Sequence, residues 1–132
     1  MSVNAHTPEL TIAREQINAS YEHNLFDACA VLMRRLLEVL LIHSYQHRSL
    51  ESKILAPEGS FKELKAIIAD ATSTGDLALS RNTKTCLDSF RVLGNFAAHK
   101  ITYNTTRDDI KNIALDFRAT VEELLYKAGL RT

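Results

Sequence analysis

The sequence predicts an all-α fold, a single antiparallel helical bundle of about five helices that forms one domain over residues 1–132. The 132 residues, of which 45% are apolar, are enough for one domain to bury a hydrophobic core. Four glycines and two prolines leave few turn residues for a many-stranded barrel or sandwich. Apolar residues recur at helical spacing through most of the chain, which favours helices over strands.

Two helices are predicted in the first third of the chain. Thr7 and Pro8 have the residue types of a cap and a first helical position. The apolar face of this helix consists of Leu10, Ala13, Ile17 and Tyr21. Asn24, with Asp27 three residues later, is predicted to cap a second helix from about Leu25 to His47. Apolar residues occupy most of the circumference of that helix, so we expect it in the middle of the bundle.

Polar residues also predict where the later helices begin. Ser60 and Glu63 match a capping box that opens a short third helix, to about Ala71. Ser80 is predicted to cap a fourth helix. The apolar stripe of that helix is expected to be Cys86, Phe90, Leu93 and Ala97.

A fifth helix is predicted near the end of the chain. Thr106 and Asp109 open it, and Gly129 ends it. Its core-facing residues keep helical register and are Ile110, Ile113, Ala114, Phe117, Val121, Leu124 and Leu125.

Composition excludes several classes of protein. Lys plus Arg and Asp plus Glu number 16 each, so the chain is neither strongly basic nor an acidic tail. Residues 28–42 form the longest apolar stretch, but charged residues interrupt it, so no membrane helix is expected. Cys29 and Cys86 lie in apolar helical stretches without C-x-x-C spacing, and residues 1–11 lack a signal-peptide core. These features predict a cytoplasmic protein with free, buried thiols.

A row of polar side chains on the fourth helix is the candidate site. Arg91, Asn95 and His99 are four residues apart, which places neighbouring Cα atoms about 6 Å from each other on one helix face. On a helical wheel this row lies opposite the predicted apolar stripe. Residues 81–107 contain five basic residues, one of which is Lys100, and one acidic residue, so their net charge is +4. A phosphate-containing ligand would suit such a row.

Two motifs resemble the HEPN superfamily of small helical domains. Residues 91–99 read R-x-x-G-N-x-x-x-H, and residues 35–38 of the second helix read R-x-x-E. The chain is most similar to a branch named as a domain of unknown function, with similarity from about Ile17 to Tyr126. This resemblance implies an antiparallel helical domain that pairs as a homodimer, with the motif helices of both subunits facing one cleft.

The resemblance also implies a function. Catalytic HEPN proteins are metal-independent endoribonucleases, some of toxin or phage-defence systems, in which the RNA 2′-hydroxyl attacks the neighbouring phosphate. By similarity, His99 would be the acid or base, Asn95 a positioning residue and Arg91 the group that stabilises the charge. Imidazole and guanidinium suit these two roles chemically.

One difference from the ribonuclease pattern leaves a second interpretation open. Ribonuclease members carry arginine directly before asparagine, whereas this chain carries Gly94. The alternative is a catalytically inactive binding or dimerisation module that engages a protein or nucleotide partner. His99 would then be an ordinary polar residue near a helix C-terminus.

Further residues are predicted beside the ligand. Arg34 or Arg35 is expected to line the cleft with Glu38 holding it in place, and Lys100 is expected to add positive charge. The sequence does not distinguish between the two arginines. No metal or other cofactor is expected, because His43 and His47 have helical ligand spacing but no third ligand is evident.

Overall fold

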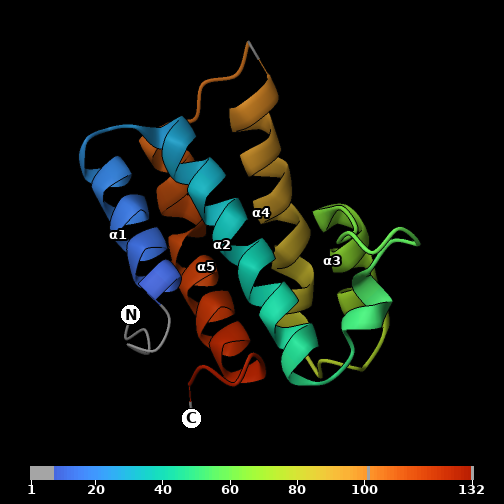
Figure 1. Ribbon diagram of the computed structural model, residues 1–132. Helices are drawn as coiled ribbons and strands as arrows, with labels where there is room; N and C mark the ends of the chain where they lie inside the picture. The colour runs from blue at the N-terminus through green and yellow to red at the C-terminus, as the bar shows by residue number, and fades with distance from the viewer. Residues whose placement is uncertain (1–7, 101, 132) are drawn as a thin grey trace.

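The computed structural model describes residues 8–100 and 102–131, and the named elements of these residues are all helices (Figure 1). The elements are α1 (Pro8–Glu22), α2 (Phe26–His47), η1 (Glu51–Ile54), α3 (Leu64–Ser73), α4 (Arg81–His99) and α5 (Arg107–Lys127). The four long helices lie side by side, and α2 and α4 run antiparallel, as do α1 and α5. The short α3 packs with η1 beside α4. The predicted all-α bundle of five helices is confirmed.

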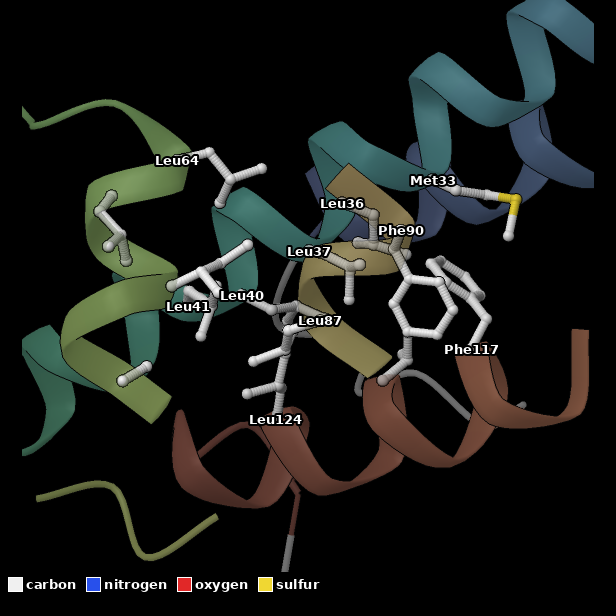
Figure 2. Close-up of a cluster of buried hydrophobic side chains, with 14 of the residues drawn as sticks. Met33, Leu36, Leu37, Leu40, Leu41, Leu64, Leu87, Phe90, Phe117 and Leu124 are labelled. Carbon is white, nitrogen blue, oxygen red and sulfur yellow. The ribbon is translucent and has the colours of Figure 1, made fainter. Parts of the chain in front are cut away.

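The central position of α2 is also confirmed. It packs against α1, α4, α5 and η1, and nine of its residues are buried. Leu37, Leu40 and Leu41 are at most 1% exposed. Figure 2 shows them within one hydrophobic cluster, in which the rings of Phe90 and Phe117 meet edge to face at 5.6 Å between centroids. No helix of the described residues has both the length and the hydropathy needed to span a bilayer.

Three of the predicted helix ends are found in the structure. The Oγ of Ser80 accepts a hydrogen bond from the backbone N of Thr83 at 3.2 Å, which caps α4. Thr106 and Asp109 form a reciprocal capping box at the start of α5. Gly129 follows α5 with a φ of +72°, a left-handed conformation that suits glycine at a helix end. Thr7, the predicted cap of α1, lies outside the described residues.

The predicted cap at Asn24 is wrong. Asn24 has a φ of +63° and ends α1 instead of opening α2. The backbone N of Asn24 donates to the O of Tyr21 at 3.2 Å, and the N of Leu25 donates to the O of Ser20 at 2.7 Å. This pair of bonds is the Schellman pattern that closes a helix C-terminus. Asparagine favours the left-handed conformation as well as helix caps, so its residue type alone does not separate the two roles.

The predicted capping box at Ser60 and Glu63 is also wrong. α3 begins only at Leu64, and the side chain of Glu63 makes no cap hydrogen bond. The Oγ of Ser60 donates to the carboxylate of Glu58 at 2.8 Å, while its backbone O accepts from the N of Ala56 at 2.7 Å. Ser60 therefore holds the loop between η1 and α3 closed, which leaves it outside the helix.

Candidate functional site

The predicted polar row lies on the second half of α4, near the end of that helix. Arg91 and Asn95 are half-buried, whereas His99 is exposed and is the last helical residue. The helical rise separates the Cα atoms of Arg91 and His99 by about 12 Å. The buried stripe of α4 is Thr83, Leu87, Phe90 and Gly94. Of the predicted stripe, only Phe90 is fully buried, and the other three members pack against the edge of the core.

Arg91 is paired within its own helix. Its Nε donates to the Oδ1 of Asp88 at 2.8 Å, the pair that a spacing of three residues allows. The Arg91 side chain is only 14% exposed, and this hydrogen bond holds the pKa of Asp88 below its usual value. The guanidinium of Arg91 is therefore paired with a carboxylate, and Arg91 lies about two turns before His99 on α4.

Gly94 of the α4 motif lies against Arg34, the residue just before the R-x-x-E motif of α2. A Cβ atom at this position would lie 2.6 Å from the Cβ of Arg34 and 2.8 Å from its Cδ. Real Cβ atoms do not tolerate such distances, so only glycine lets α4 approach the side chain of Arg34 this closely. The glycine of R-x-x-G-N on α4 thus makes room for the side chain of an arginine on α2.

The side chain of Arg34 brings a second cation to α4. Cα–Cβ bonds tilt toward the N-terminus of their helix, and α2 runs antiparallel to α4 (Figure 1). The stem of Arg34 therefore leaves α2 in the direction of the His99 end of α4. The Nε of Arg34 is buried and has no hydrogen-bond partner among the described residues. Buried polar atoms are normally satisfied, so this Nε is an available donor.

The structure distinguishes Arg34 from its neighbour Arg35. Arg35 is exposed, and the contact with Gly94 is made by Arg34. Glu38 is half-buried, but no ion pair joins it to either arginine in the described part of the chain. The role of Glu38 in holding an arginine in place therefore stays a prediction.

Lys100 lies against an aromatic surface just beyond the row. Its Nζ is 5.4 Å from the centre of the Phe96 ring, and the Tyr103 ring packs on Phe96 at 5.7 Å between centroids. A hollow of about 380 Å³ opens beside these rings on the outer face of α4, with Asp88 and Val92 in its wall. Lys100 is exposed and adds its charge close to His99.

Comparison with known families gives one result. The family described as Domain of unknown function (DUF4145) matches residues 15–129, which is most of the chain. The chain belongs to the DUF4145 family. The matched part includes α2 and α4, and hence both motifs and the Arg34–Gly94 contact. No curated protein and no solved structure matches this DUF4145 chain, and its similarity to the HEPN superfamily stays a prediction.

Other chemically reactive residues of the DUF4145 domain lie away from the row. The described residues contain no group of three or more His, Cys, Asp or Glu side chains arranged to hold a metal ion. His47 packs its ring against Gly129 at the end of α5. Both cysteines are free, and burial raises the pKa of the Cys29 thiol. The buried thiol donates weakly to the backbone O of Ile17, at 3.7 Å.

The contact between Arg34 and Gly94 was not predicted from the sequence. Gly94 itself is the signal in the sequence. A glycine inside a long helix lowers helix stability by about 1 kcal/mol relative to alanine, so its presence indicates close packing. What the sequence lacked was the partner, since residues 34 and 94 come together only through the antiparallel packing of α2 on α4.

Proposed function

We propose that this DUF4145 domain is an RNA-directed protein that binds phosphate at Arg34, Asn95 and His99. The observation that carries the proposal is the Arg34 side chain, whose buried Nε lacks a partner where it crosses Gly94. A guanidinium with a free donor suits a phosphate oxygen, because it offers charge and directed hydrogen bonds together. Asn95 follows Gly94 directly, and His99 lies one turn further along α4.

The same groups have the chemistry of metal-independent RNA cleavage. The 2′-hydroxyl of RNA attacks the adjacent phosphorus and gives its proton to the imidazole of His99. The P–O5′ bond breaks, the 5′-oxygen takes up a proton from water or from the protonated His99 imidazole, and a cyclic phosphate remains. Arg34 stabilises the extra negative charge on phosphorus, and Asn95 positions the phosphate. Arg91 plays a supporting part, because Asp88 already holds its Nε.

The active form we propose is a cytoplasmic homodimer. In the HEPN proteins that the chain resembles, the motif helices of two subunits face one cleft. The exposed end of α4 suits this arrangement, because His99 and Lys100 are accessible there and Phe96 is 39% exposed. A second copy would then bring a second set of these groups to the RNA.

RNA cleavage in the presence of a metal chelator tests this proposal. The wild-type chain should cleave single-stranded RNA and leave cyclic phosphate ends, and His99→Ala should lower the rate by about 100-fold or more. His23→Ala is the matched control, since His23 is also exposed but lies in the turn after α1. Equal cleavage by the wild type and His99→Ala would exclude His99 as the catalytic acid or base.

An inactive binding module is the second candidate function. It is favoured by Gly94, which stands where the ribonucleases carry arginine, and by the Asp88 partner of Arg91. A protein of this kind would bind RNA or a nucleotide without cleaving it. Binding that is lost on combined replacement of Arg34, Asn95 and His99, with no cleavage by the wild type, would identify this function.

A further inference from the structure

A cavity of about 460 Å³ lies between α1 and α5, on the side of α2 away from α4's polar row. It exists because α1 packs on α2, and α5 packs on α2 and α4, while α1 and α5 make little contact with each other. Its size falls within the range of sites for small molecules. None of the residues proposed to bind RNA lines it.

The floor of the cavity is apolar and comes from three helices. Ile17 belongs to α1, Met33 and Leu36 to α2, and Ile110 and Phe117 to α5. Met33 is 4% exposed and Phe117 is 8% exposed, so both are part of the hydrophobic core as well as of the cavity wall. Such a floor favours an apolar ligand body over a sugar or a free ion.

The rim of the cavity is mainly basic. It carries Arg14 on α1 and Lys111 and Arg118 on α5, with Glu22 as its acidic residue. Asn18 adds an uncharged polar group. The rim therefore has a positive charge above an apolar floor, which is the pattern that complements an amphipathic anion.

The helices α1 and α5, which border the cavity, run in opposite directions (Figure 1). The guanidinium of Arg107 lies 5.0 Å from the centre of the Tyr21 ring, which places the start of α5 beside the end of α1. Arg14 lies about two turns before Tyr21 on α1, and Arg118 lies about three turns after Arg107 on α5. Both guanidiniums thus belong to the half of the cavity farther from Tyr21, about one turn apart, and the apolar floor runs from there toward Tyr21.

We propose that this cavity binds a small amphipathic anion. Its carboxylate or phosphate head lies between Arg14 and Arg118, and its unbranched apolar body lies on Met33, Leu36 and Phe117. From Arg14 to Glu22 the cavity extends about 12 Å along α1, enough for a medium-length acyl chain. This site is separate from the proposed RNA site, so either proposal can fail without the other.

Titration calorimetry of the full chain with decanoate tests the site. Ala114 is an exposed residue that lines the cavity, whereas Ala119 is exposed on the same helix but does not line it. The wild type and Ala119→Trp should bind one equivalent of decanoate with similar affinity. Ala114→Trp, which fills the cavity from its open side, should bind at least about tenfold more weakly. Equal binding by the two tryptophan variants would overturn the proposal.

The head group is tested separately. Arg118→Gln should weaken decanoate binding by about fivefold or more, and decanol should bind more weakly than decanoate to the wild type. Decanol binding as tight as decanoate binding would overturn the role of the arginines. A further outcome is that the wild type does not bind decanoate and forms a dimer that Ala114→Trp dissociates. This outcome would identify the cavity face as an interface between copies and would also overturn the proposal.

Discussion

At Gly94 two opposing effects act on the stability of α4. Glycine inside a helix loses more backbone entropy on folding than alanine, at a cost of about 1 kcal/mol. The missing side chain, however, lets Arg34 of α2 lie directly against the backbone of α4. The net effect is decided by space, because a Cβ here would lie 2.6 Å from the Arg34 Cβ, which is close to its own backbone and cannot swing away.

We therefore predict that Gly94→Ala lowers the free energy of unfolding by about 1–3 kcal/mol, although alanine is the better helix former. Gly75→Ala is the matched control. Gly75 has no atom within 4 Å of a built Cβ, so this change should leave stability unchanged or raise it by up to about 1 kcal/mol. Denaturant unfolding of both variants measures the difference. A Gly94→Ala protein as stable as Gly75→Ala would contradict the close contact.

At the scale of elements, acidic side chains fix the segment that joins α4 to α5. The Oδ1 of Asp27, near the start of α2, accepts from the backbone N of Thr105 at 2.9 Å. The Oδ2 of Asp109 accepts from the N of Thr106 at 2.9 Å and from the hydroxyl of Tyr103 at 2.8 Å. These bonds tie residues 103–106 to the start of α2 and to the first turn of α5.

The carboxylate of Asp109 should make stability depend on pH. Its hydrogen bonds from Thr106 and Tyr103 hold the pKa of Asp109 below its usual value. Because the pKa is lower in the folded state, ionised Asp109 stabilises the fold in full above the pKa of the unfolded state, near 4. This stabilisation is lost as the pH falls through the pKa of the folded state. At pH 7 we predict that Asp109→Asn costs about 1 kcal/mol, as expected for a damaged helix cap.

Urea unfolding of the wild type and Asp109→Asn at several pH values measures this effect. The gap between the two proteins should be constant from pH 7 to about pH 5 and should shrink below about pH 4. A gap that stays constant to pH 2 would show that Asp109 acts without its charge.

At the scale of the whole molecule, the sequence predicts the features that depend on local pattern. Helical periodicity identifies all five helices and the central place of α2, and the caps at Ser80 and Thr106 are local hydrogen bonds. The contact between Arg34 and Gly94 depends instead on how α2 packs on α4. The cavity between α1 and α5 likewise depends on how far apart these two helices lie in the bundle. Neither feature has a signature within one segment.

The proposed homodimer is also a property of the whole molecule. We predict that light scattering gives twice the chain mass of 14.8 kDa at micromolar concentration. Phe96→Asp should shift the equilibrium toward the monomer, because it places a charge on the exposed aromatic surface beside His99. Leu115→Asp is the control, since Leu115 is 77% exposed on α5. A monomer at all concentrations would exclude the shared cleft.

The central claim is that Arg34, and not its neighbour, supplies the phosphate-binding cation, and a paired binding measurement tests it most directly. Fluorescence anisotropy with a short single-stranded RNA would compare Arg34→Gln with Arg35→Gln, which removes the same charge from the exposed neighbouring position. We predict that Arg34→Gln weakens binding by about tenfold and Arg35→Gln by no more than about twofold, at matched melting temperatures. Equal losses from the two variants, or unchanged binding by Arg34→Gln, would contradict the proposed site.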